Sequence, residues 1–153
     1  MSRFLDEGAS VIAVARGRGG LTILKDGHPD AALTILAGDV AQATTAKQAT
    51  TAALRQGGHI DVVCNTAGVL DAYRPVLETS IEQWQTILAV NLTSQFLLIK
   101  QTLPIMLEQG HGVYVNMASI AGLVAGGGGA AYTASKHAII GLTKQLDADY
   151  AAQ

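Results

Sequence analysis

Four short runs of apolar, β-branched residues recur along the chain, and helix-forming stretches separate them. Each run is continuously apolar rather than alternating, which is typical of strands buried on both faces of a parallel sheet. The runs are SVIAVAR (10–16), LTILAGDV (33–40), IDVVCNTAG (60–68) and GVYVNMAS (112–119). This alternation predicts an α/β fold with a doubly wound parallel sheet.

The stretches between the runs carry helix signals. Residues 41–56 are rich in helix formers and end at a pair of glycines. The segment 79–109 opens with TSIE, in which Thr79 and Glu82 form a capping-box pattern. The last helix is predicted from about Ala130 to the end of the chain.

The composition narrows the class of protein. The chain has 153 residues, the length of one domain over 1–153, with 49% hydrophobic and 14% charged residues. The net charge of −2 and the absence of a basic cluster argue against nucleic acid or an anionic membrane as a partner. No apolar run approaches the roughly 20 residues of a membrane span.

Cysteine and histidine usage gives two further expectations. Cys64 is the single cysteine, which excludes an internal disulfide and suits a reducing cytoplasm. The four histidines are scattered without the spacing of metal ligands, so no metal site is predicted.

Three polar residues form a pattern with chemical meaning. Ser119 ends the fourth apolar run, and Tyr132 and Lys136 follow it, thirteen and seventeen positions further on. The four-residue step puts Tyr132 and Lys136 on one helix face, a turn apart. A cation about 4 Å from a phenol favours its ionised form by roughly 4 kcal/mol at an effective dielectric of 20. Taken singly, a serine or a tyrosine at such a place would usually be a packed or capping residue.

The sequence motifs around these residues make the pattern specific. They are NTAG (65–68), ILAVNLTSQF around Asn91, NMASIAG (116–122) and YTASKHAIIGLTK (132–144). Together they closely resemble the short-chain dehydrogenase/reductase family over essentially the whole chain. The resemblance implies a hydride transfer between a nicotinamide cofactor and a small carbonyl or alcohol substrate.

The resemblance also implies four catalytic roles. Tyr132 would pass a proton to or from the substrate oxygen, and Ser119 would hydrogen-bond the same oxygen. Lys136 would hold the nicotinamide ribose and stabilise the phenolate, and Tyr132 would also be among the cofactor-binding residues. Asn91 would fix a water in the proton relay, although it could also be a helix interruption and no more.

The residue at the end of the run 10–16 indicates whether NAD(H) or NADP(H) is preferred. Family members that prefer NAD usually carry an aspartate there, which binds the ribose 2′-hydroxyl. Here that place is Ala15, and Arg16 follows it. An arginine offers bidentate contacts to a 2′-phosphate, so NADP(H) is predicted over NAD(H). The alternative is that Arg16 is simply a solvent-exposed loop residue with no cofactor contact.

Five further residues match the family's cofactor contacts. Asp39 and Val40 resemble the pair that touches the adenine, and Asn65, Ala67 and Gly68 match the NNAG motif. The motif needs small residues because the backbone approaches the cofactor closely. The second position is Thr66 instead of asparagine, which is a mild departure.

The family's first strand and its glycine-rich T-G-x-x-x-G-x-G turn are not found in these residues. We therefore expect a partial Rossmann-like domain that also lacks the family's C-terminal strands. The missing first strand would lie between the runs 10–16 and 60–68, leaving their inner edges unpaired.

Two functions of different classes follow from these residues. One is a cytoplasmic NADP(H)-dependent oxidoreductase, active in its full-length form. The other is a non-catalytic remnant that acts at most as an oligomerisation or interaction module. The family often associates through the helices that here span 91–109 and 131–150, which predicts a homodimer or homotetramer.

Overall fold

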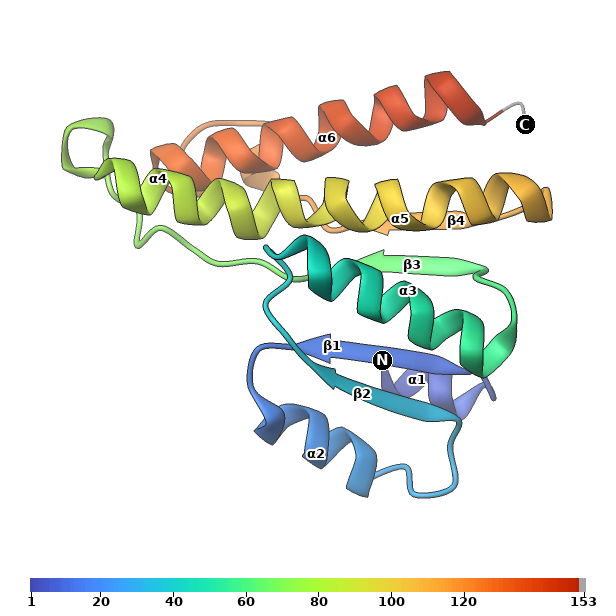
Figure 1. Cartoon of the computed structure of the whole chain (residues 1–153). Coiled ribbons are helices and arrows are strands. Elements are labelled where there is room, and N and C mark those ends of the chain that lie inside the picture. The colour runs from blue at the N-terminus through green and yellow to red at the C-terminus, as the bar shows by residue number, and fades with distance from the viewer. Residues whose placement is uncertain (152–153) are drawn as a thin grey trace.

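The four apolar runs form parallel strands in the computed structural model, which describes residues 1–151. β1 (Val11–Ala15) pairs with β2 (Leu33–Ala37), and β3 (Val62–Asn65) pairs with β4 (Val113–Asn116). All four arrows point the same way in Figure 1. The predicted α/β fold with parallel strands is confirmed.

The strands form two separate two-stranded sheets, because β1 and β3 do not pair with each other within residues 1–151. Figure 1 shows β1 and β3 as the inner strands, with β2 and β4 outside them. This order agrees with the prediction that a further strand belongs between the runs 10–16 and 60–68. The inner edges of β1 and β3 therefore have no strand partner in the part of the chain that the structure describes.

Helices pack around these strands. α3 contacts both β1 and α5, and thus bridges the two sheets (Figure 1). α2, which the sequence analysis did not predict, packs on β1 and β2. The helices are α1 (Ser2–Asp6), α2 (Arg18–Asp26), α3 (Ala43–Gly57), α4 (Ile81–Leu88), α5 (Ser94–Gln109) and α6 (Ala130–Tyr150).

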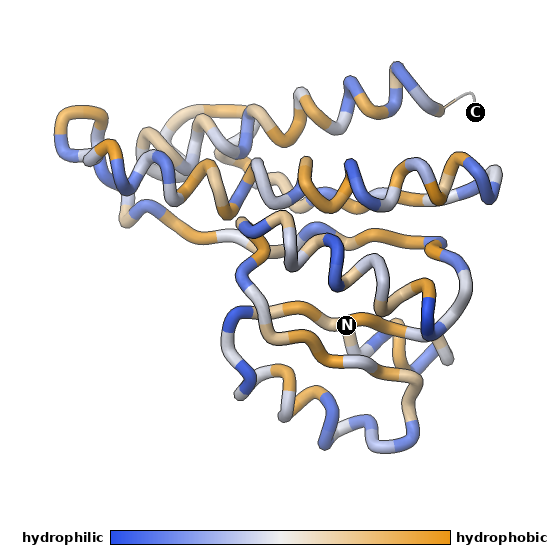
Figure 2. The backbone as a smooth tube through the Cα atoms, in the orientation of Figure 1, coloured by the Kyte–Doolittle hydropathy of each residue, from blue (hydrophilic) through white to orange (hydrophobic). Residues whose placement is uncertain are grey.

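Only one face of the β3–β4 sheet is buried. Val63 of β3 is buried in a core with Ile60 and Met106, and side chains of α3 and α5 pack against this core. On the other face Val62 and Val113, which pair across the strands, are 41% and 55% exposed. Figure 2 shows orange, hydrophobic stretches along the strands. The expectation of burial on both faces is therefore wrong for β3 and β4, because no element of residues 1–151 covers the second face.

The start of α4 differs from the predicted capping box. Ser80 is the N-cap, and its Oγ accepts a hydrogen bond of 3.1 Å from the backbone N–H of Gln83. The hydroxyl of Thr79 instead donates to the carbonyl of Pro75 at 2.9 Å, which closes the preceding 3-10 turn η1 (Val76–Glu78). The prediction of Thr79 as the cap is wrong because that turn already uses its hydroxyl.

The predicted helix over 79–109 is divided in two. A π turn, η2 (Ala89–Thr93), lies between α4 and α5 and contains Asn91. Pro104 lies inside α5, which continues to Gln109. The sequence therefore located the helical segment and its interruption at Asn91, but not the form of the interruption.

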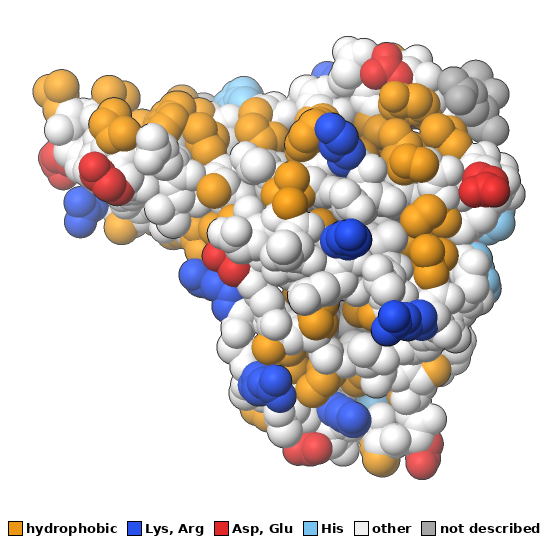
Figure 3. All heavy atoms as spheres, viewed as in Figure 1, with side chains coloured by type: hydrophobic (Ala, Val, Ile, Leu, Met, Phe, Trp, Pro, Cys, Tyr) orange, Lys and Arg blue, Asp and Glu red, His pale blue; other side chains and the backbone are white. Residues whose placement is uncertain are grey.

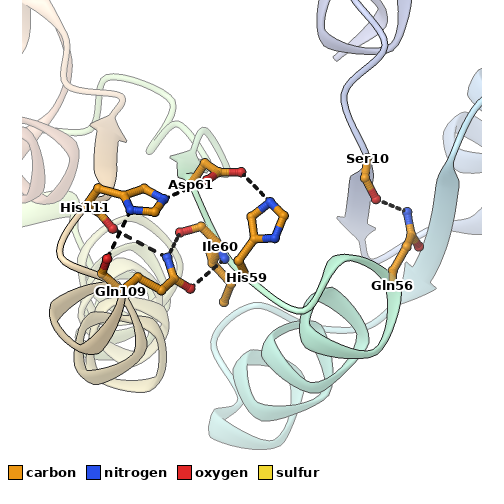
Figure 4. A network of polar contacts seen from close by, with 7 residues as sticks. All are labelled: Ser10, Gln56, His59, Ile60, Asp61, Gln109 and His111. Atoms are coloured by element: carbon orange, nitrogen blue, oxygen red, sulfur yellow. Dashed lines mark hydrogen bonds and ion pairs between the residues drawn. The ribbon is translucent and has the colours of Figure 1, made fainter.

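A polar network joins the elements at the amino ends of β3 and β4 (Figure 4). The Gln109 side chain accepts from the N–H of Ile60 at 2.9 Å and donates to its carbonyl at 3.0 Å. Asp61 contacts His59 and His111, each at 3.1 Å. These contacts fix the end of α5 to the start of β3, at the opposite end of the strands from Asn65 and Ser119.

Candidate active site

Tyr132 and Lys136 lie on one side of α6, one turn apart. The Lys136 Nζ lies 5.5 Å from the centroid of the Tyr132 ring. The same Nζ donates a hydrogen bond of 2.7 Å to the carbonyl of Met117, just beyond β4. Lys136 is only 3% exposed, and this burial lowers the pKa of its ammonium group. The structure thus brings together the amine and the phenol that the sequence analysis paired.

Two glycines allow close packing around this helix face. A Cβ at Gly128 would lie 2.5 Å from Cδ1 of Tyr132, so only a glycine lets the loop before α6 pass this ring. A Cβ at Gly122 would lie 2.6 Å from the carbonyl oxygen of Lys136. Gly122 ends the 3-10 turn η3 (Ile120–Gly122), which therefore sits directly on α6.

Ser119 stands beside this helix at the N-cap of η3. Its Oγ accepts a hydrogen bond of 3.2 Å from the backbone N–H of Ala121. Within residues 1–151, no hydrogen bond joins Ser119 to Tyr132. The structure thus places the serine after β4, on the turn that packs on α6, with its hydroxyl engaged in that turn.

Asn91 is fully buried in the π turn, and both polar atoms of its carboxamide are hydrogen-bonded. Its Oδ1 accepts from the N–H of Val69 at 2.8 Å, and its Nδ2 donates to the Val69 carbonyl at 3.0 Å. Nδ2 also donates to Ser135 Oγ at 3.1 Å, and that hydroxyl donates to the Tyr132 carbonyl at 2.7 Å. Asn91 therefore ties the segment after β3 to the helix that carries Tyr132.

The NTAG segment leads from β3 towards Asn91 and Lys136. Asn65 is buried, and its Nδ2 donates to Asn116 Oδ1 at 2.9 Å, which joins the ends of β3 and β4. Ala67 and Gly68 are exposed. A Cβ at Gly68 would lie 3.5 Å from Asn91 Oδ1 and 3.8 Å from Lys136 Nζ. An open stretch of backbone thus borders the buried lysine.

Arg16, Asp39 and Val40 follow the other two strands. Arg16 is exposed, and no ion pair involves it among the described residues. Asp39 is also exposed, and its Oδ1 accepts from the N–H of Ala41 at 3.0 Å. Val40 is half-buried. The carboxyl ends of parallel strands share one edge, so these residues line the same edge as Gly68.

Two residues of the site were missed by the sequence analysis. Ser135 links Asn91 to the Tyr132 carbonyl, and its position beside Lys136 on the helix was the only available signal. Asp71 is fully buried and binds the first turn of α6. Nothing in the local sequence VLDAY distinguishes it from a surface aspartate in a loop.

Comparison with known proteins identifies the family. A model of the short chain dehydrogenase family matches residues 1–153, and the chain belongs to this family. It is 34% identical over 154 residues to 3beta-hydroxysteroid dehydrogenase 2 of Eggerthella lenta, covering 99% of this chain and 59% of that relative. It is 45% identical over 115 residues to 2-(R)-hydroxypropyl-CoM dehydrogenase of Xanthobacter autotrophicus, covering 74% and 46%.

Solved structures give the same fold. The crystal structure of levodione reductase superimposes with a TM-score of 0.91 at 30% identity, covering 98% of this chain and 60% of that one. The serine dehydrogenase of Escherichia coli gives a TM-score of 0.87 at 30% identity, covering 96% and 68%. The chain thus spans 59% of the first relative's length and 60% of the reductase chain.

The described residues form neither a membrane-spanning helix nor a cluster of metal ligands. None of the helices in residues 1–151 combines the length and the apolar character needed to cross a membrane. The same residues hold no group of three or more His, Cys, Asp or Glu side chains arranged as metal ligands. Membership of the short chain dehydrogenase family implies a nicotinamide cofactor, and the open backbone at Gly68 beside the buried Lys136 amine is compatible with one.

Proposed function

We propose that the full-length protein transfers a hydride between NADP(H) and a small carbonyl or alcohol substrate. The observation that carries this proposal is the position of the Lys136 amine, 5.5 Å from the Tyr132 ring centroid. A cation beside a phenol favours the ionised phenol, and therefore proton transfer through it. Membership of the short chain dehydrogenase family and the similarity to levodione reductase support the class of reaction.

Each residue of the site has its own role in the proposed reaction. A bound nicotinamide cofactor would supply or accept the hydride at the substrate carbon. In the reduction, the Tyr132 hydroxyl gives its proton to the substrate oxygen, and Ser119 hydrogen-bonds that oxygen. Lys136 would hold the ribose of the cofactor through its buried amine. The Asn91 carboxamide keeps Val69 and Ser135 in place, and Asn91 is proposed to fix the water through which the proton is replaced.

The catalytic proposal is tested by Tyr132→Phe in the full-length protein. We expect kcat to fall about 10²–10⁴-fold, the range of general acid–base catalysis. NADPH binding, followed by its fluorescence, should stay unchanged. Tyr150→Phe is the matched control because Tyr150 lies on the same helix, near its other end. Normal turnover by Tyr132→Phe would end the catalytic assignment.

The preference for NADP(H) rests on Arg16. This arginine is exposed at the end of β1 and follows Ala15, so no carboxylate at that position repels a 2′-phosphate. Charge-assisted contacts to a phosphate are worth about 1.5–3 kcal/mol, or roughly 10–100-fold in affinity. Arg16→Ala should therefore weaken NADPH binding by this factor and leave NADH binding nearly unchanged, with Arg55→Ala as the control. Equal weakening of both cofactors would contradict the preference.

The proposed assembly is a homodimer or homotetramer through α5 and α6. Phe96 on α5 is 48% exposed, with the Lys100 amine 5.9 Å from its ring centroid. Sedimentation of Phe96→Ser against wild type tests this, and an unchanged distribution of species would exclude Phe96 from the interface. The alternative of a non-catalytic interaction module predicts association without NADPH binding.

The remaining partner proposals rest on composition and surface charge. Figure 3 shows Lys and Arg side chains spread over the face in view rather than gathered into a patch. This distribution gives no support to a nucleic-acid partner. The single cysteine supports the proposal of a reducing cytoplasmic location.

A further inference from the structure

Asp71 is a fully buried carboxylate in the loop between β3 and η1. Its Oδ1 accepts from the backbone N–H of Gly129 at 2.9 Å and of Tyr73 at 3.2 Å. Its Oδ2 accepts from the N–H of Tyr132 at 2.8 Å. Both oxygens act only as acceptors, which is the role of an ionised carboxylate. A buried charge is costly unless it is hydrogen-bonded, and these three donors meet that need.

The three donors belong to two segments that are far apart in the sequence. Gly129 is the N-cap of α6 and Tyr132 lies in its first turn, where backbone N–H groups have no partners within the helix. A negative charge is favourable at this end of a helix. Asp71 therefore holds the first turn of α6 at the Tyr132 backbone itself, whereas Asn91 contacts the helix through Ser135.

The loop on the other side of Asp71 is strained. Ala72 and Tyr73 are the non-glycine residues with positive φ in the described chain, at 56° and 58°. This backbone conformation is unfavourable for a residue with a Cβ and persists only where the surroundings hold it. Besides Asp71, the carbonyl of Arg74 holds this turn by accepting from the N–H of Ala130 at 3.1 Å. The strained turn is therefore fastened to the start of α6.

We propose that Asp71 is a positioning residue for Tyr132. It fixes the first turn of α6 against the 71–74 turn. This contact sets the position of the Tyr132 hydroxyl relative to the substrate oxygen that receives its proton. The inference rests on the proposed function, because it assigns Asp71 a part in the same reaction. Asp71 touches neither substrate nor cofactor and acts through the backbone of Tyr132.

Asp71→Asn is the most direct perturbation. The amide keeps one acceptor oxygen and replaces the other by an NH₂ group, which must then face a backbone N–H. Whichever way the amide turns, either Gly129 or Tyr132 loses its acceptor. With NADPH and 4-nitrobenzaldehyde as probes, we expect kcat to fall about 10²-fold, the effect of a displacement on the order of 1 Å. The KM for NADPH should change by less than about three-fold.

A double-mutant cycle separates this role from a general structural one. If Asp71 acts through Tyr132, then Asp71→Asn added to Tyr132→Phe should lower the residual kcat no further. The matched control is Ser80→Ala, which removes the N-cap contact of α4 and should leave kcat unchanged. An additive loss in the double variant, or an equal loss in Ser80→Ala, would overturn the proposal.

A readout independent of turnover keeps the two proposals apart. In protein labelled with 3-fluorotyrosine, the fluorine resonance of Tyr132 is the one that disappears in Tyr132→Phe. It should move in Asp71→Asn and stay in place in Ser80→Ala. If Tyr132→Phe turns over normally, the proposed function fails whatever Asp71 does. If Tyr132→Phe is inactive but Asp71→Asn changes neither kcat nor the resonance, the role of Asp71 alone fails.

A second variant covers the case in which Asp71→Asn does not fold. A Cβ at Gly129 would lie 2.6 Å from Asp71 Oδ2 and 2.5 Å from the carbonyl oxygen of Arg74. Gly129→Ala therefore forces the same contact apart from the helix side. It should shift the Tyr132 resonance and lower kcat at least ten-fold. An unshifted resonance with wild-type kcat in Gly129→Ala would contradict the proposal.

Discussion

Asn91→Ala should destabilise the protein far more than an ordinary loss of a side-chain amide. The substitution leaves the N–H and the C=O of Val69 without the partners that Asn91 provides at 2.8 and 3.0 Å. An unpaired buried polar group costs about 1–3 kcal/mol. Val69 is half-buried, so the lower part of that range applies to each group, about 2–4 kcal/mol in total. The better helix propensity of alanine offsets less than about 1 kcal/mol of this.

The loss is measured as the change in the free energy of unfolding, from urea titrations of the full-length variant and wild type. Gln145→Ala is the matched control, because this amide donates to Asp149 Oδ1 at 2.6 Å on the exposed surface of α6. Its removal should cost less than about 0.5 kcal/mol. A loss in Asn91→Ala as small as in Gln145→Ala would show that water replaces the amide. The argument that Asn91 holds Val69 would then be refuted.

Three further predictions concern other parts of the structure. Burial lowers the Lys136 pKa below its usual 10.5, so between the lowered value and 10.5 the unfolded state binds more protons. The difference in unfolding free energy between wild type and Lys136→Met should therefore rise with pH in that window. A difference that does not change with pH would contradict this. Ser80→Ala should cost about 1 kcal/mol and Thr79→Ala less, by urea titration, and the reverse order would restore the predicted capping box. Gly122→Ala should cost about 1–3 kcal/mol because its Cβ would meet Lys136 O, whereas Gly141→Ala, with open space around it, should not destabilise.

The strands were predictable because β-branched runs describe them directly, but one helix was not. α2 contains Gly19 and Gly20 in its first turn, and glycines at that place indicate a loop. Leu21 is buried beneath the helix, on β1 and β2. Tertiary packing thus outweighs the local preference of the two glycines.

The hydropathy of a run also does not say which neighbours are present. Val113 and Val115 made the fourth run continuously apolar, which predicts cover on both faces. They are exposed because the elements that pack on this sheet within residues 1–151 all lie on its other face. The sequence pattern reports what a strand is suited to contact, whereas the structure reports what contacts it.

The candidate site was also predictable only in part. The spacing of Tyr132 and Lys136 on one helix was sufficient to predict that they face each other, because four residues make one turn. The role of Asp71 was not predictable, because its carboxylate accepts hydrogen bonds from the start of a helix that begins about sixty residues later. The direction of the Ser119 hydroxyl depends on the turn that follows it, which the sequence does not specify.

The π turn at Ala89–Thr93 sets the rotational phase between α4 and α5. Ile87 and Ile99 flank it and are both buried. At 100° per residue, twelve positions of uninterrupted α-helix would set them about 120° apart. The π turn accommodates one extra residue, which reduces the offset to about 20°. A continuous α-helix of the same length would therefore turn Ile87 about 100° away from its present direction. Deleting one residue from 89–93 would instead keep Ile87 and Ile99 in phase, but it would remove the π turn that contains Asn91.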